Sequence, residues 1–184
     1  MVTVICPGFH DRTLTDEFLA GLDADWRESP LVFPAERSSP VSAIALWQFL
    51  EANISDRRGI PLVWIGFSAG VVAAIAVSVL WRQSGGRVKG AIAVDGWGVP
   101  LGGDFPAYRV SHDRFTHDSS RLLGGGNESF YADPGVEHLD LWRSPQTASG
   151  WWLRETETGL KTAIPTTADR AIVEMLKQFG ELND

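Results

Sequence analysis

The sequence predicts an α/β fold: a three-layer sandwich in which helices cover both faces of a mostly parallel sheet of about six strands. Short runs rich in β-branched residues recur along the chain and are separated by segments with helical periodicity, which is typical of a parallel sheet between helices. With 184 residues, 44% of them hydrophobic, the chain is long enough for one complete core. We therefore expect residues 1–184 to form a single domain.

Six segments have the composition expected of strands. They are Val2–Cys6, Leu31–Phe33, Leu62–Phe67, Lys89–Val94, Ala107–His112 and Ser129–Ala132. Helices are expected at Thr15–Leu22, at Val41–Ile54, from Ser68 to about Gln83, and after Thr166–Thr167. The helix after Ser68 is almost wholly apolar, which indicates burial at the centre of the molecule.

Two short segments near the C-terminus stand outside this scheme. In Trp151–Glu155 and Leu160–Ile164, apolar and polar residues roughly alternate, and the two segments flank a turn that contains Gly159. This pattern predicts a β-hairpin.

Charge and composition exclude several classes of partner. The formal net charge is -7 and no stripe of basic residues is present, so we expect the chain to bind neither nucleic acid nor an anionic membrane. No segment approaches the run of about 20 apolar residues that a membrane helix needs, and the residues after Met1 lack the basic region of a secretory signal. Cys6 is the single cysteine, which excludes an internal disulfide and a cysteine metal cluster. A cytoplasmic protein is the expectation.

The segment Gly66–Gly70, with the sequence Gly-Phe-Ser-Ala-Gly, lies between the strand Leu62–Phe67 and the apolar helix. It matches the pattern G-x-S-x-G together with the strand, turn and helix that this pattern requires. A nucleophile at the tip of a strained turn needs small neighbours, because the strand and helix backbones approach each other closely on both sides. The segment therefore indicates that Ser68 is a catalytic nucleophile.

With this motif in its context, the chain resembles the α/β-hydrolase family along essentially its whole length. The resemblance implies a minimal version of that fold and a catalytic triad in the chain order serine, acid, histidine. It also implies an oxyanion hole formed by the backbone N–H of Ala69 and by that of Phe9, in the loop after the first strand. Many relatives have His-Gly where this chain has Pro7-Gly8, which is a departure from the family pattern.

A serine hydroxyl needs a base within hydrogen-bond reach, and the chain has four histidines. His138 follows the last strand in a segment that resembles the Gly-x-x-His loop of the family, so it is the predicted base. His112 and His117 come earlier, near the end of the fifth strand, and are expected to be structural or to line the pocket. His10 lies in the predicted oxyanion loop, where it contacts a substrate, orients that loop or is solvated.

The acid that orients the base should stand at the end of a strand between Ser68 and His138. Two aspartates meet this condition: Asp113 at the end of the fifth strand and Asp95 at the end of the fourth. Most relatives carry the acid at the position that Asp113 occupies. Asp113 is therefore the preferred acid, and Asp95 is the alternative.

These residues predict a serine hydrolase that acts on small ester or thioester substrates through an acyl-enzyme on Ser68. The sequence contains no phosphate-binding, dinucleotide-binding or metal-binding motif, so we expect neither a cofactor nor a metal. The segment between Asp95 and Ala107 is too short for a lid, which predicts an open, shallow site. Trp97 and Phe9 would either offer apolar surface to the substrate there or pack in the core. The alternative function is a non-catalytic protein that uses the hydrolase scaffold to bind a ligand.

Overall fold

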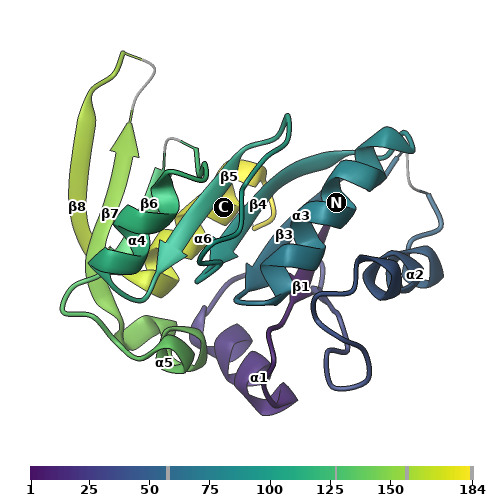
Figure 1. Ribbon diagram of the computed structural model, residues 1–184, viewed down its shortest axis with the longest axis horizontal. Helices are drawn as coiled ribbons and strands as arrows, with labels where there is room; N and C mark the ends of the chain where they lie inside the picture. Colours follow the sequence, from purple (N-terminus) through teal and green to yellow (C-terminus); the bar gives the residue numbers. More distant parts are fainter. Residues whose placement is uncertain (57–58, 127, 156–157, 183–184) are drawn as a thin grey trace.

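The computed structural model describes residues 1–56, 59–126, 128–155 and 158–182, and within these residues the chain forms eight strands and six α-helices. The strands are β1 (Val2–Cys6), β2 (Leu31–Val32), β3 (Leu62–Phe67), β4 (Val88–Val94), β5 (Ala107–Ser111), β6 (Glu128–Ala132), β7 (Ser149–Glu155) and β8 (Lys161–Thr167). The helices are α1 (Arg12–Gly21), α2 (Ala43–Asn53), α3 (Gly70–Gln83), α4 (Arg114–Arg121), α5 (His138–Arg143) and α6 (Ala168–Phe179). All eight strands belong to one sheet (Figure 1).

The sheet is mostly parallel, as the sequence predicts. Its strand order is β2-β1-β3-β4-β5-β6-β7-β8, and every pairing from β2 to β6 is parallel. The six strands predicted from the sequence are all present, each with ends within one residue of the prediction. Their apolar runs are long enough to be recognised because parallel strands are covered on both faces.

The C-terminal hairpin is confirmed, but it extends the sheet instead of standing apart from it. β7 pairs antiparallel with β6, and β8 pairs antiparallel with β7, so the sheet has eight strands and not about six. Trp152 lies opposite Phe130 of β6 and packs into the same core as Ile172 of α6. This buried tryptophan ties the hairpin to the sheet, whereas β8 at the edge is largely exposed. Thr156 and Glu157 of the expected turn lie outside the described residues.

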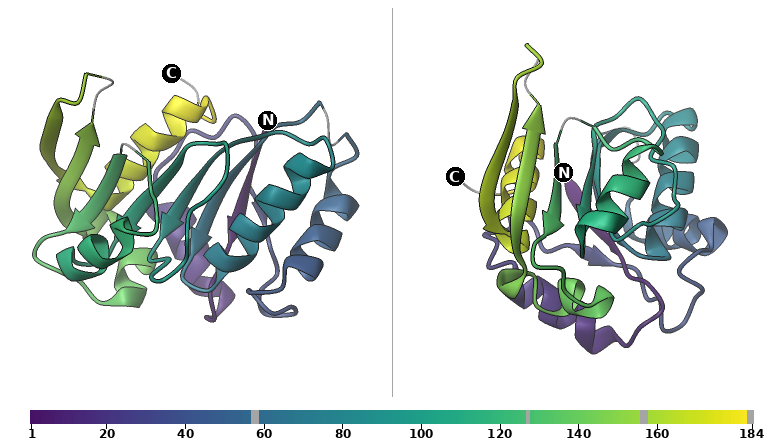
Figure 2. Two further views of the ribbon diagram at one scale, coloured as in Figure 1. Left: turned by 45° about the horizontal axis from the view of Figure 1, so that its top comes forward. Right: turned by 60° about the vertical axis from the view of Figure 1, so that its left-hand side comes forward.

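The helices cover both faces of the sheet (Figure 2). Phe18 of α1 and Ile172 of α6 belong to the core on one face, and Leu46 of α2 and Val77 of α3 belong to the core on the other. The prediction that α3 lies buried at the centre of the molecule holds for one side of the helix only. The other side, which carries Val72, Val79 and Leu80, is exposed. No helix in the described part of the chain is long and apolar enough to cross a membrane.

Candidate active site

The loops that carry the candidate residues follow the carboxyl ends of neighbouring parallel strands. The loop with Phe9 follows β1, Ser68 follows β3, and Asp95 follows β4. From β1 the chain continues to β2, towards one edge of the sheet, and from β3 it continues to β4, towards the opposite edge. The direction of the strand order therefore reverses between β1 and β3. Open α/β sheets bind their ligands at the carboxyl edge beside such a reversal. The topology thus places Ser68 where this kind of fold has its sites.

Ser68 occupies a sharp turn between β3 and α3. Its φ is +51°, a left-handed conformation that is uncommon for a residue with a side chain, and its N–H donates to the carbonyl of Val94 at 2.9 Å. A Cβ added at Gly70 would collide with the carbonyl oxygen of Cys6, and one added at Gly66 would press on the backbone of Val71. The two glycines of the motif therefore allow α3 to begin directly against β1 and β3. The predicted strand, turn and helix are confirmed.

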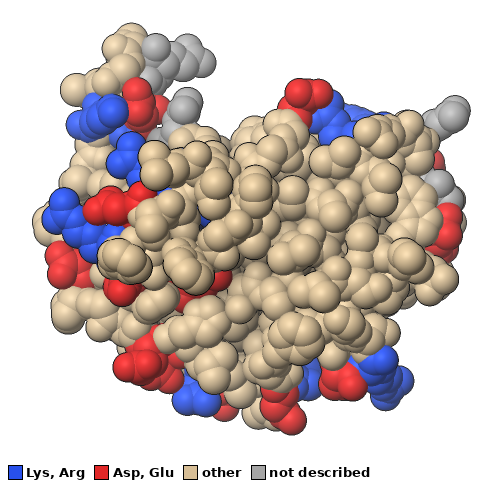
Figure 3. Space-filling view, viewed as in Figure 1, with Lys and Arg blue, Asp and Glu red and all other residues tan. Residues whose placement is uncertain are grey.

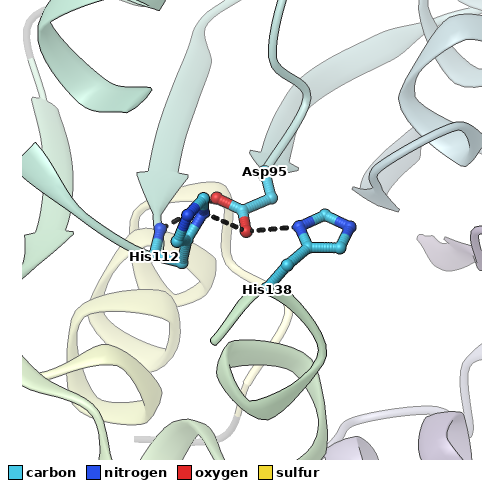
Figure 4. Close-up of side chains that lie close together, drawn as sticks. All are labelled: Asp95, His112 and His138. Carbon is cyan, nitrogen blue, oxygen red and sulfur yellow. Dashed lines mark hydrogen bonds and ion pairs between the residues drawn. The ribbon is translucent and has the colours of Figure 1, made fainter. Parts of the chain in front are cut away.

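His138 is the first residue of α5 and is held from two directions. Its Nδ1 lies 2.8 Å from Oδ2 of Asp95 (Figure 4). Its ring also stacks on that of Phe67, with 4.8 Å between the ring centroids, and Phe67 in turn stacks on Trp142 of α5. The sequence predicts a loop at this position, but the six residues of α5 are too few for helical periodicity to reveal. The imidazole is thus fixed by one hydrogen bond and one aromatic face.

The contact expected of Asp113 is made by Asp95, so the preference for Asp113 is wrong in geometry. The side chain of Asp95 is 1% exposed and its Oδ2 accepts from His138. Asp113 is instead the N-cap of α4, where its Oδ1 accepts the N–H of Thr116 at 2.7 Å. A strand-end aspartate that begins a helix satisfies the unpaired N–H groups of that helix, so the carboxylate of Asp113 is engaged there and not with His138.

His112 is a residue whose place in the site the sequence leaves undecided. Its Nδ1 lies 2.8 Å from the same oxygen of Asp95 that His138 contacts, and its backbone N–H donates to the other oxygen at 2.8 Å. The hydrogen bond to Asp95 raises the pKa of His112, partial burial opposes this, and the negative charges of Asp95, Asp113 and Glu137 add to it. Its position directly after β5, at the carboxyl edge of the sheet, is the signal that could have identified it.

Ser68 and His138 line one open cavity of about 580 Å³. The remaining lining residues are Ala69, Val72, Asp95, Trp97, Val99, His112, Phe115 and Thr116. One side is thus apolar, and Trp97 and Phe115 are 66% and 74% exposed. Figure 3 shows that the middle of this face, over α3 and its surroundings, consists mainly of uncharged residues, with the charged ones towards the rim. The cavity therefore offers apolar surface to one part of a ligand and polar groups to another.

A buried arginine holds the apolar wall in place. The guanidinium of Arg109 donates to the carbonyl oxygens of Gly96 at 3.3 Å, Val99 at 2.8 Å and Gly124 at 2.5 Å. Burial lowers the pKa of Arg109 to about 10. Because the carbonyls of Gly96 and Val99 lie on either side of Trp97, Arg109 anchors the short connection between β4 and β5 to β5.

The two predicted oxyanion donors, Phe9 and Ala69, lie in the loop after β1 and at the start of α3. Within the residues that the structure describes, neither the N–H of Phe9 nor that of Ala69 has a hydrogen-bond acceptor. The Cβ of Ser68 is close to the backbone at Gly8, since a Cβ added to this glycine would lie 3.2 Å from it. The side chain of Phe9 is exposed and does not line the cavity with Trp97.

The other two histidines take no part in this cavity. His10 lies in the loop after β1, where its Nδ1 is 2.9 Å from the carbonyl oxygen of Asp11, and burial lowers its pKa. His117 of α4 is wholly buried beside Tyr131, and burial lowers its pKa to about 4. The expectation of a structural role fits His117. His10 packs edge-on against Phe67, so it touches the residue that supports His138.

Asp95, His112 and His138 also have the residue types of a metal site, with one potential ligand atom of each within 4.8 Å of the others. The geometry argues for hydrogen bonding instead. Nδ1 of His112 and Nδ1 of His138 both point at Oδ2 of Asp95, each at 2.8 Å, and not at a vacant position beside it. A metal bound by both nitrogens would have to take the place of Oδ2, but this carboxylate is buried and held by the backbone N–H of His112.

The sequence was compared with models of known protein families and with curated proteins. No family model matches the chain, and no curated protein has significant similarity to it.

Proposed function

We propose that this chain is a serine hydrolase with the minimal α/β-hydrolase fold, in which Ser68 is the nucleophile, His138 the base and Asp95 the acid. The observation that carries the proposal is the 2.8 Å contact between Asp95 Oδ2 and His138 Nδ1, in a cavity that Ser68 also lines. A carboxylate only accepts hydrogen bonds, so Nδ1 carries the proton and Nε2 keeps its lone pair. That tautomer is the one a general base requires.

The reaction is acyl transfer to water. The Oγ of Ser68 attacks the carbonyl carbon of the substrate while its proton passes to Nε2 of His138, and Asp95 stabilises the resulting imidazolium. Collapse of the tetrahedral intermediate breaks the bond to the leaving group, which takes the proton from His138. Water then attacks the acyl-enzyme, gives its proton to His138, and releases the acid and the serine hydroxyl.

The oxyanion of each tetrahedral intermediate is assigned to the N–H groups of Phe9 and Ala69. The absence of an acceptor for either group among the described residues supports this assignment, because unpaired and preorganised donors stabilise a developing negative charge. Ala69 also stands one residue before the first turn of α3, where the helix dipole favours negative charge.

The resemblance to α/β-hydrolases agrees with the chain order of the three residues. Ser68, Asp95 and His138 follow β3, β4 and β6, so the order is serine, acid, histidine. The acid after β4, one strand earlier than in most relatives, is the difference from the pattern that the resemblance implies. A carboxylate there reaches the same imidazole, since neighbouring parallel strands end at one edge.

We assign small esters or thioesters as the substrate class. The support is the short connection between β4 and β5, which Arg109 fixes in place, and the open apolar wall formed by Val72, Val99, Trp97 and Phe115. Such a wall binds an acyl group by apolar contact without enclosing a long chain.

Labelling by a fluorophosphonate probe tests the proposal, because the probe reacts with an activated serine. We expect stoichiometric labelling of the wild type at Ser68, and none in Ser68→Ala or His138→Ala. Ser68→Ala should unfold at nearly the wild-type temperature, since it removes no core volume. His117→Phe is the matched histidine control and should still be labelled. Labelling that persists in Ser68→Ala would refute the assignment.

The alternative is a protein that uses the same cavity for binding only. The exposure of Trp97 and Phe115 favours it, since exposed aromatic residues are common at binding surfaces. A folded wild type that takes no label, hydrolyses no ester, and yet binds an acyl compound with a change in Trp97 fluorescence would establish this alternative.

A further inference from the structure

One oxygen of Asp95 serves two histidines. Oδ2 accepts a hydrogen bond from Nδ1 of His138 and another from Nδ1 of His112, each at 2.8 Å. Figure 4 shows the two rings on opposite sides of the carboxylate. The remaining oxygen, Oδ1, accepts the backbone N–H of His112. His112 therefore holds both oxygens of the carboxylate that orients His138.

His112 faces further charges on its other side. Its Nε2 is 3.7 Å from Oδ2 of Asp113, the N-cap of α4, and Glu137, the residue before α5, adds a third negative charge. The hydrogen bond to Asp95 and these charges raise its pKa against the effect of partial burial. The other imidazole at the carboxylate is that of His138, whose ring centroid is 5.9 Å away. His112 is thus set to gain a proton more readily than an isolated histidine.

We propose that His112 is a positioning residue that controls how strongly Asp95 supports His138, by neutralising part of the carboxylate charge whenever it gains a proton. This inference rests on the proposed function, in which His138 receives the proton of Ser68. With His112 neutral, the full charge of Asp95 stabilises the imidazolium at His138. With His112 protonated, two like charges stand about 6 Å apart around one carboxylate, and we expect proton transfer to His138 to slow by about tenfold.

Two titratable groups that share one partner gain and lose protons as a pair. The value of kcat/KM should therefore fall in two steps as the pH is lowered, and one of them is the partial loss that follows when His112 gains its proton. A histidine that only packs against the site would leave a single step.

Two variants separate these cases. His112→Asn keeps an N–H donor for Asp95 but cannot gain a proton, so it should retain turnover and show one acid step. Asp113→Asn removes one of the charges that face His112 and leaves an asparagine able to cap α4, so the first step should move to lower pH. If kcat/KM of His112→Asn falls at acid pH along the same curve as kcat/KM of the wild type, the proposal is overturned.

A measurement without turnover keeps this result separate from the proposed function. In Ser68→Ala, the ring nitrogens of His138 are followed by NMR as the pH is lowered, with and without His112→Asn. We expect a titration in two steps for His138 in Ser68→Ala and in one step in the double variant. Identical single-step curves overturn the coupling. Two-step curves in a protein whose wild type takes no fluorophosphonate label support the coupling and refute the hydrolase.

Discussion

The ring of His138 lies on the ring of Phe67, with 24° between the ring planes. Phe67 is the residue directly before Ser68, so the side chain that ends β3 also supports His138, the base that we propose for this serine. Trp142, which stacks on the same phenylalanine, comes from α5, the helix that His138 begins. The serine turn and the start of α5 therefore share one aromatic stack.

Replacing Phe67 by leucine should lower activity more than its effect on stability would suggest. The ring of His138 loses its flat support, and displacement of a catalytic group by a fraction of an ångström reduces rates strongly, so we expect kcat/KM to fall by about tenfold. The free energy of unfolding should fall by about 1 kcal/mol. Ester hydrolysis and chemical denaturation measure the two effects.

Phe130→Leu is the matched control for this variant. Phe130 of β6 is equally buried in the same core but has no ring contact with His138 among the described residues. It should lose similar stability and keep its kcat/KM. Equal losses of activity in the two variants would show that core packing, and not support of the imidazole, explains the effect.

The two strand-end aspartates should respond very differently to the same substitution. In Asp95→Asn the amide no longer holds His138 in the tautomer of a base, and we expect kcat/KM at neutral pH to fall by about 10⁴-fold. Asp113→Asn should stay within about threefold of the wild type, because asparagine caps a helix as well as aspartate does. A comparable loss of kcat/KM in Asp113→Asn would identify Asp113, and not Asp95, as the acid.

The strands and the serine turn could be predicted because their signals are local. The apolar run of β3 and the glycines on either side of Ser68 lie within a few residues of one another, and steric contact with Cys6 and Val71 explains why glycine is needed. The hairpin could also be recognised from its alternation. Its place in the sheet could not, because that depends on the pairing of Trp152 with Phe130, which is far away in the sequence.

The acid could not be chosen from strand ends alone. The choice depends on whether a carboxylate caps the next helix, and α4 is so polar that periodicity does not reveal it. Because α4 starts at Arg114, Asp113 is its N-cap and its carboxylate binds the helix backbone. Asp95 precedes no helix, so its carboxylate accepts hydrogen bonds from the two histidines instead. The sequence analysis expects His138 to meet a strand-end aspartate, and only the fold identifies Asp95 as the one that it contacts.

His117 should make the protein less stable in acid. Burial lowers its pKa to about 4, from 6.5 in an unfolded chain, so between these values the unfolded state binds a proton that the folded state does not. Stability is then lost as the pH falls through this window. Between pH 7 and pH 5 the loss due to His117 is about 2 kcal/mol. Urea unfolding at the two pH values measures it.

His117→Phe removes this titration and no hydrogen bond, because neither ring nitrogen has a partner in the described structure. The difference in stability between pH 7 and pH 5 should therefore be about 2 kcal/mol smaller in the variant than in the wild type. Parallel losses in both proteins would mean that His117 gains its proton in the folded state as easily as in the unfolded one.

The length of the acyl group should show how far the apolar wall reaches. Each buried methylene stabilises binding by about 0.8 kcal/mol, so rates should rise while the chain still contacts Val72, Val99 and Trp97. Beyond Trp97 and Phe115, which are themselves largely exposed, further methylenes stay in water and add nothing. Across p-nitrophenyl esters from acetate to palmitate, we therefore expect an optimum of kcat/KM at short chains. Trp97→Ala should flatten the rise, whereas Trp151→Ala, whose indole contacts Asp133 outside this cavity, should leave it unchanged. An optimum at long chains would contradict the small-acyl assignment.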